Sequence, residues 1–240
     1  QLGLDGRANS LLVLKFSYLP PTMQDDSIDN LWLARTLHHL GAVHFGDFSV
    51  GRSTTHSPIY IDLKVMLGDP TVLRNAAKLI QQETRFGQSL RRPKVGWFDV
   101  VAGVPYGGLH LATAFSLETN TPLTYARQPK EVSESSHVIE GIRPPGGTAL
   151  IVDDLVTGGR SILETASLFR QEGLNVQDVI VLVDRDQGAA ERLKREGLHL
   201  ISILKLPVML NLYAAEGWIS EDQHQNATEY IRAARHRAAE

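Results

Sequence analysis

Apolar residues follow two alternating patterns between residues 70 and 206, helical spacing and short continuous runs. Spacing of three and four residues predicts helices, and short apolar runs predict strands buried on both faces. Alternating strands and helices of this length favour right-handed crossovers and an α/β fold, with a central parallel sheet flanked by helices. The expected order is helix 70–86, strand 98–104, helix 107–118, strand 122–126, strand 148–153, helix 160–172, strand 176–184, helix 187–196 and strand 198–205.

The segments on either side of this pattern are organised differently. Residues 27–40 have leucines at helical spacing, which predicts an amphipathic helix with Ser27 as its N-cap. The runs 43–51 and 58–65 are rich in β-branched and aromatic residues and predict a hairpin or two neighbouring strands. The predicted organisation is an N-terminal extension (1–26), a small helix-and-strand unit (27–69), the α/β core (70–206) and C-terminal helices (207–240).

The composition narrows the classes of function. A chain of 240 residues suffices for one large α/β domain with an appendage. The net charge of -3 gives no overall basic surface, so nucleic acid is not an expected partner. No apolar run approaches the roughly 20 residues of a membrane span, so no membrane partner is expected. The absence of cysteine excludes disulfides and a cysteine nucleophile, and it fits a reducing cytoplasm.

The stretch ALIVDDLVTGGRS, residues 149–161, carries the most informative chemistry. Its apolar run predicts a strand that ends at Asp153 and Asp154, and open α/β sheets bind ligands at the carboxyl ends of their strands. The glycine-containing turn that follows opens a helix, so free N–H groups and the positive helix end favour a phosphate there. A sugar phosphate suits this arrangement. The alternative is a plain strand-turn-helix connection in which the Asp pair caps the helix.

A second glycine-containing loop, GVPYGG at residues 103–108, ends one predicted strand and begins the next helix. Its glycines would let backbone N–H groups approach a diphosphate, although the loop alone also fits an ordinary turn. The polar segment 127–146 exceeds the usual connection of about 4–6 residues, which favours a functional lid. Two such turns and a lid suggest a ligand with phosphates at two ends and hydroxyl groups between them.

Five motifs carry a family resemblance over nearly all of residues 31–206. They are FGDF (45–48), SPIYIDLK (57–64), GVPYGGLHLA (103–112), IVDDLVTGGRS (151–161) and VLVDRDQGA (181–189). In order and spacing they resemble type I phosphoribosyltransferases, and within that class orotate phosphoribosyltransferases. The resemblance implies a small N-terminal hood, the donor phosphoribosyl diphosphate (PRPP) with Mg²⁺, orotate as the acceptor, and a homodimer whose lid reaches the neighbouring site.

The resemblance also implies roles for particular residues. Asp153 and Asp154 would hold the ribose hydroxyls, and with Lys130 they form the expected catalytic set. The other expected contacts to PRPP are Thr157, Gly158, Gly159, Arg160, Ser161, Pro105, Tyr106, Gly107 and Arg127. The residues expected at orotate are Arg52, Tyr60, Ile61, Thr157 and Arg185. No side chain is expected to bind Mg²⁺ directly, because PRPP carries most of its ligands.

The lid departs from the pattern of the family that the chain resembles. Gln128 stands where a lysine is expected, and Glu131 replaces the lysine implied to act on the departing diphosphate. A carboxylate there repels the diphosphate, so Lys130 is the expected replacement cation. Gly107 also stands where some members carry lysine. Three functions stay open: an active orotate phosphoribosyltransferase, which we favour, a catalytically weakened regulatory homologue that binds PRPP or a nucleotide, and a phosphoribosyltransferase for another base.

Overall fold

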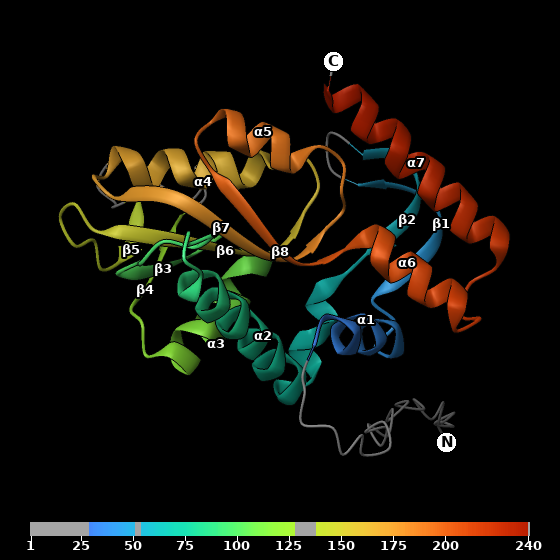
Figure 1. Ribbon diagram of the computed structural model, residues 1–240, viewed down its shortest axis with the longest axis horizontal. Helices are drawn as coiled ribbons and strands as arrows, with labels where there is room; N and C mark the ends of the chain where they lie inside the picture. Colours follow the sequence, from blue (N-terminus) through green and yellow to red (C-terminus); the bar gives the residue numbers. More distant parts are fainter. Residues whose placement is uncertain (1–28, 51–53, 128–137, 240) are drawn as a thin grey trace, which may run out of the picture.

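The computed structural model describes residues 29–50, 54–127 and 138–239, and a six-stranded sheet forms the centre of this part of the chain (Figure 1). The strand order is β5-β4-β3-β6-β7-β8, and all neighbours are parallel except β4 and β5. The predicted parallel sheet is therefore confirmed. The strands are β3 (Val100–Gly103), β4 (Leu123–Ala126), β5 (Ile139–Gly141), β6 (Thr148–Val156), β7 (Asn175–Asp184) and β8 (His199–Lys205).

Helices cover both faces of this sheet, as the alternating pattern predicted (Figure 1). One face packs against α2 (Pro70–Ser89) and α3 (Gly107–Thr119), and the other against α4 (Arg160–Gln171) and α5 (Ala189–Arg195). Successive side chains of a strand point to opposite faces. The two apolar clusters accordingly take alternate residues of the central strands: Val101, Leu150 and Val152 on the first face, and Val100, Ala102 and Ile151 on the second.

The direction of the crossovers reverses between β3 and β6. From β3 the chain passes through α3 to β4, whereas from β6 it passes through α4 to β7 on the other side. The loops after β3 and β6 therefore leave the sheet in opposite directions, which is the topology at whose carboxyl strand ends open α/β sheets bind ligands. This topology places the loop at 103–108 and the turn at 157–159 on neighbouring strands.

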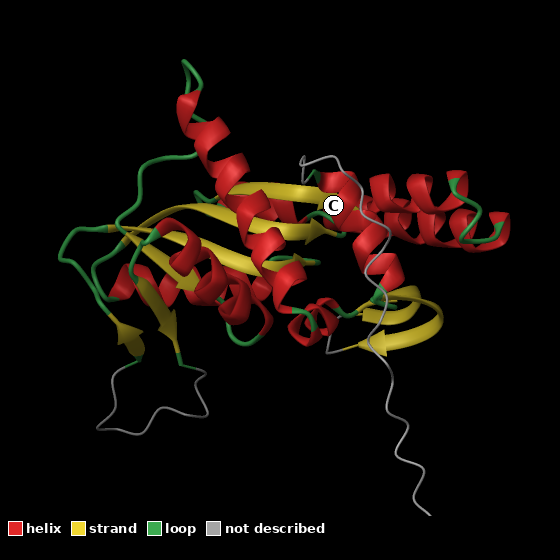
Figure 2. Cartoon of the chain, turned by 90° about the horizontal axis from the view of Figure 1, so that it is seen from below, coloured by secondary structure: helices red, strands yellow, loops and turns green. Residues whose placement is uncertain are grey.

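The remaining elements form the hood and the C-terminal part. The hood consists of α1 (Asn30–His39), the antiparallel hairpin β1 (Val43–Val50) and β2 (Thr54–Ile61), and the 3₁₀ helix η1 (Leu63–Gly68). The hairpin lies beyond the carboxyl end of β7 (Figure 2). The C-terminal part consists of α6 (Leu206–Ala215) and α7 (Glu221–Ala239). Within the described ranges, none of the helices is both long enough and apolar enough to span a membrane.

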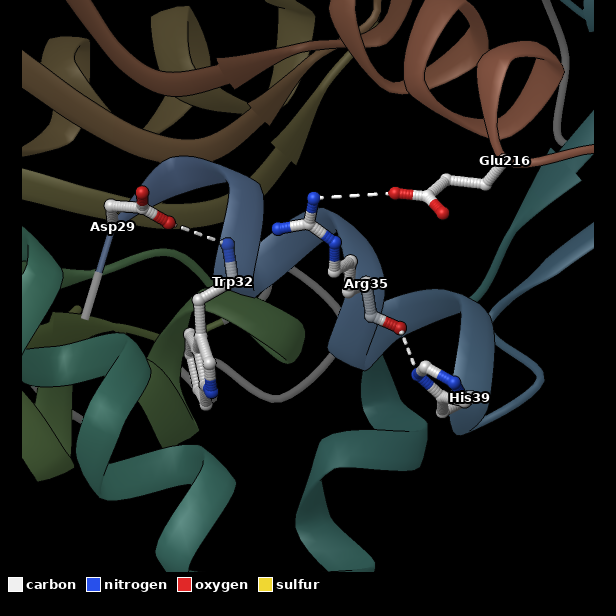
Figure 3. Close-up of polar contacts among 5 residues, drawn as sticks. All are labelled: Asp29, Trp32, Arg35, His39 and Glu216. Carbon is white, nitrogen blue, oxygen red and sulfur yellow. Dashed lines mark hydrogen bonds and ion pairs between the residues drawn. The ribbon is translucent and has the colours of Figure 1, made fainter. Parts of the chain in front are cut away.

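Polar contacts join the first helix to the C-terminal part. Arg35 of α1 forms an ion pair of 3.3 Å with Glu216 at the end of α6 (Figure 3). The buried Tyr213 hydroxyl donates a hydrogen bond of 2.7 Å to the Ala34 carbonyl oxygen. The hood helix is thus fixed by residues about 180 positions later in the sequence.

Several predicted boundaries were wrong, each for a local reason. Strand β6 continues past the Asp pair to Val156, because Leu155 and Val156 still pair with β7. Helix α1 begins at Asn30, and its N-cap is Asp29 rather than Ser27, since the Asp29 side chain accepts a hydrogen bond of 2.7 Å from the Trp32 N–H (Figure 3).

Two further elements differ from the prediction. The second hood strand ends at Ile61 instead of continuing to residue 65. Asp62 caps η1 there by accepting a hydrogen bond of 3.1 Å from the Lys64 N–H, which turns the chain. The polar segment 127–146 contains the short strand β5, which extends the sheet antiparallel to β4.

Candidate active site

The acid pair lies near the carboxyl end of β6, within the strand rather than after it. Asp153 is 7% exposed, and Asp154 is partly buried. The Asp154 N–H donates a hydrogen bond of 2.9 Å to Asp153 Oδ1, and the Leu155 N–H donates one of 2.8 Å to Asp154 Oδ1. Each carboxylate is therefore held by the backbone N–H of the residue that follows it.

The turn that begins α3 packs directly on this pair. A Cβ atom added to Gly107 would lie 2.6 Å from Asp154 Cγ, and one added to Gly108 would lie 2.6 Å from the Val152 carbonyl oxygen and 2.7 Å from Asp153 Oδ1. At Gly108 the close atoms belong to the β6 backbone, so a residue without a side chain is required there. At Gly107 the close atoms belong to the Asp154 side chain, so a larger residue there would displace that carboxylate.

Burial controls the electrostatics of the pair. It raises the pKa of Asp153 well above its usual range, and the neighbouring Asp154 charge raises it further. Burial also raises the pKa of Asp154, but the hydrogen bond with Asp153 and the positive charge of Lys64 oppose this shift. Lys64 forms an ion pair of 3.1 Å with Asp62 at the start of η1. The charged form of Asp154 is thus better supported than that of Asp153.

The turn between β6 and α4 is suited to a phosphate. Gly159 has a φ of 75°, a left-handed conformation that favours glycine, and helix α4 begins at the next residue without a side-chain cap. The first N–H groups of a helix without such a cap can bind an anion. The side chain of Arg160 is exposed and bonds to Glu164 at 2.8 Å, so it points along the helix surface. A direct contact between Arg160 and PRPP stays a prediction.

Arg185 joins the end of β7 to the hood. It is 4% exposed, and its Nη2 donates hydrogen bonds to Ser57 Oγ at 3.0 Å and to the Ile59 carbonyl oxygen at 3.2 Å. Burial lowers the pKa of its guanidinium. The structure therefore brings Arg185 to β2, the strand that carries Tyr60 and Ile61, and their contacts to an acceptor stay predictions.

The base of the predicted lid lies at the β4 end of the sheet. Arg127 follows β4 and forms an ion pair with Glu140 of β5, and its N–H donates a hydrogen bond of 2.8 Å to the Val138 carbonyl oxygen. Lys130, together with Gln128 and Glu131, lies outside the described residues, and so does Arg52 of the hood. Their predicted roles stay predictions.

Two residues that the structure places at the acid pair, Gly108 and Lys64, were given no role from the sequence. Gly108 packs on Asp153, and Lys64 lies near enough to Asp154 to lower its pKa. The signal for Gly108 was available, because it is the third glycine of the GVPYGG loop at residues 103–108. The signal for Lys64 was weaker, because its approach to Asp154 depends on the turn into η1.

Comparisons with known proteins agree with this geometry. The family described as the phosphoribosyl transferase domain matches residues 69–202. Orotate phosphoribosyltransferase of Caenorhabditis elegans is 34% identical over 212 residues, which cover 88% of this chain and 87% of that protein.

Solved structures show the same similarity. The UMP synthase of Leishmania donovani superimposes with a TM-score of 0.74 at 32% identity, covering 85% of this chain and 42% of that one. Orotate phosphoribosyltransferase of Aeropyrum pernix superimposes with a TM-score of 0.65 at 32% identity, covering 78% of this chain and 99% of that one. The chain thus spans less than half of the Leishmania protein.

The glycine contact predicts a stability difference between two alanine variants. Gly108→Ala should lower the free energy of unfolding by about 1–3 kcal/mol, because the added methyl group overlaps the β6 backbone. Gly68→Ala is the matched control, since a Cβ there meets nothing within 4 Å. Urea unfolding of both variants tests this, and equal effects would contradict the packing argument.

The raised pKa of Asp153 predicts a pH-dependent stability. An acid with a raised folded-state pKa contributes stability that is fully present below its unfolded pKa of about 4 and is lost as the pH rises through the folded value. Asp153→Asn should therefore be more stable than the wild type at pH 7, and this advantage should shrink towards pH 4. Thermal unfolding at both pH values measures the difference, and an equal advantage at both would exclude the ionisation as its cause.

Proposed function

The chain belongs to the phosphoribosyltransferase family, and we propose that it transfers the 5-phosphoribosyl group of PRPP to orotate, giving orotidine 5′-monophosphate and diphosphate in pyrimidine nucleotide biosynthesis. The observation that carries this proposal is the arrangement around β6. The Asp153 and Asp154 pair lies under one glycine turn and is followed by a second turn suited to a phosphate. Relatives named orotate phosphoribosyltransferase support orotate as the acceptor.

The acid pair meets the electrostatic demand of the reaction. A ring nitrogen of orotate loses its proton and bonds to the anomeric carbon while the bond from that carbon to the diphosphate oxygen breaks, and the departing diphosphate can accept that proton. Positive charge develops on the ribose ring and negative charge on the leaving group. Asp153 and Asp154 would accept hydrogen bonds from the ribose hydroxyls, and the ionised Asp154 would place negative charge beside the ring. Lys64 supports that ionised form.

The loop at 103–108 and the turn at 157–161 would orient PRPP by holding its diphosphate and its 5′-phosphate. Backbone N–H groups at residues 157–161 would hold the 5′-phosphate at the start of α4. The loop of Pro105, Tyr106 and Gly107 would face the diphosphate from the neighbouring strand, and Arg127 would approach it from the base of the lid. A donor held at both ends presents its anomeric carbon in a fixed position, which lowers the entropy lost in reaching the transition state.

The acceptor would bind between the hood and the end of β7. The Arg185 guanidinium suits the carbonyl or carboxylate oxygens of orotate, and its Nε lacks a hydrogen-bond partner within the described part of the chain. Tyr60 and Ile61 would flank the pyrimidine ring from β2. Arg52 and Thr157 complete the proposed set of acceptor contacts.

The residues around the pair fit a magnesium ion that arrives with the donor. The described residues contain no group of three or more His, Cys, Asp or Glu side chains that could hold a metal ion by themselves. Magnesium is usually held by one or two carboxylates together with substrate phosphates and water. The ribose hydroxyls held by Asp153 and Asp154, and the diphosphate, would supply its ligands. When bound, the ion neutralises charge on the diphosphate.

We further propose a cytoplasmic homodimer in which the lid of one subunit reaches the site of the other. The position of the lid base supports this assembly: Arg127 lies at the end of β4, and β3 separates that strand from the acid pair on β6. The cysteine-free sequence suits a reducing compartment.

The central test is turnover by the purified chain. With PRPP, Mg²⁺ and orotate, the chain should consume orotate, seen as a loss of absorbance, and release an equal amount of diphosphate. Asp154→Asn should lower kcat/KM by about 10² or more, because it removes negative charge beside the developing cation. Asp222→Asn, at an exposed position on α7, is the control and should leave the rate unchanged.

Other outcomes of this assay identify the alternatives. Thermal stabilisation by PRPP without turnover would indicate a regulatory homologue. Turnover with another base but not with orotate would indicate a different acceptor. Full activity of Asp154→Asn would remove the assignment of the pair.

The lid provides a separate test. Lys130→Ala should lower kcat by about 10² if Lys130 stabilises the departing diphosphate, since one transition-state electrostatic contact is lost. The KM for orotate should change little. Lys194→Ala on the exposed side of α5 is the control. An unchanged kcat would show that Lys130 does not replace the missing lid lysines.

A further inference from the structure

An acidic residue in the turn after β7 connects three parts of the chain. Asp186 has a φ of 56°, and its side chain is only 14% exposed. Its Oδ1 lies 3.2 Å from Lys205 Nζ at the end of β8, and its Oδ2 lies 3.3 Å from Arg235 Nη1 near the end of α7. Each oxygen of one carboxylate thus pairs with a different cation. We call the set of Asp186, Lys205 and Arg235 the acceptor clamp.

The C-terminal helix is packed firmly enough for this contact to be specific. Ala227 is fully buried and Ile231 is 4% exposed in the core that also contains the hood residues. A Cβ atom on Gly188 would overlap the Cβ of Ala238, so the end of α7 touches the turn that leads into α5. Figure 1 shows α7 passing the β1 and β2 hairpin on its way to this turn.

The residues on either side of Asp186 carry unmet hydrogen-bonding groups. Arg185 Nε and Gln187 Nε2 are buried, and neither has a hydrogen-bond partner among the described residues. A buried donor without a partner is unfavourable unless an acceptor atom is supplied. Tyr230 of α7 also lies close enough to Arg185 to oppose the lowering of its pKa by burial. The turn at 185–187 therefore offers two buried donors without a described partner, and α7 packs beside it.

We propose that α7 sets the affinity for the acceptor base by fixing the turn at 185–187 through the acceptor clamp. This inference rests on the proposed function, because it takes Arg185 as a contact to orotate. Asp186 and Arg235 are positioning residues: they touch no substrate and act through Arg185. The proposed donor contacts come from the ends of β3, β4 and β6, whereas the clamp joins β7, β8 and α7. Loss of the clamp should therefore affect the two substrates unequally.

The experiment measures the two KM values separately in the full chain. Asp186→Asn removes both ion pairs and should raise the KM for orotate about tenfold, while kcat and the KM for PRPP change less than about twofold. Arg235→Gln removes one pair and should raise the KM for orotate about threefold. Arg235→Lys keeps the positive charge, so its KM for orotate should lie closer to that of the unchanged chain than to that of Arg235→Gln. Arg232→Gln, an exposed arginine on the same helix, is the control.

A double variant tests whether these residues act together. Asp186→Asn with Arg235→Gln should bind orotate no more weakly than Asp186→Asn alone, because the second change removes a contact already lost. Additive losses would show that Arg235 does not act through Asp186.

The possible failures are distinguishable. An unchanged KM for orotate in an active Asp186→Asn protein would overturn the clamp and leave the proposed function intact. Equal rises in both KM values, with a matching fall in thermal stability, would also overturn it by showing a general structural role. If Asp186→Asn does not fold, the KM values for orotate of Arg235→Gln and Arg235→Lys test the clamp instead, and equal values for these two variants and the unchanged chain would overturn it. No turnover by the wild type would overturn the function and the clamp together.

Discussion

The contact between the Gly107 and Gly108 turn and the Asp153 and Asp154 pair is the constraint on which the site depends. It exists because β3 and β6 are hydrogen-bonded neighbours and their following helices leave in opposite directions. The turn at Gly107 and Gly108 packs on the carboxylates, and at Gly108 the distance to the β6 backbone is too short for a Cβ atom. The same closeness buries the carboxylates and raises their pKa values. Packing and electrostatics are therefore two consequences of one arrangement.

This constraint also explains where the cations of the site can lie. Gly107 carries no charge, so positive charge beside the pair comes from other elements. Lys64 supplies some of it from η1, where Asp62 turns the chain after β2. Arg127 is already paired with Glu140, which reduces the charge it offers. If the diphosphate binds as proposed, the lid is therefore an important further source of positive charge for the leaving group.

The sequence predicted those parts of the structure that depend on neighbouring residues. Apolar runs identified the parallel strands, and the glycine turns were found because each lies within one short motif. Prediction failed where distant segments decide the outcome. β5 forms only because β4 offers it an edge, whereas the early end of β2 at Asp62 is a local cap that the run of apolar residues masked. The link from Asp186 to Arg235 crosses 49 positions and depends on the path of α7, which no local spacing encodes.

The same distinction separates the two halves of the proposed site. The donor half is built from two local turns on adjacent strands, so its geometry follows from short stretches of sequence and the pairing of β3 with β6. The acceptor half combines β2, the end of β7 and α7, and Arg185 reaches the hood across 128 positions. A change in the packing of α7 therefore acts directly on the acceptor contacts, and it reaches the phosphate turn after β6 through the hydrogen bond of 3.0 Å from the Arg185 N–H to the Val156 carbonyl oxygen. In a fold with this division, affinity for the base can change through substitutions far from the base, whereas binding of the sugar phosphate depends on residues that touch it.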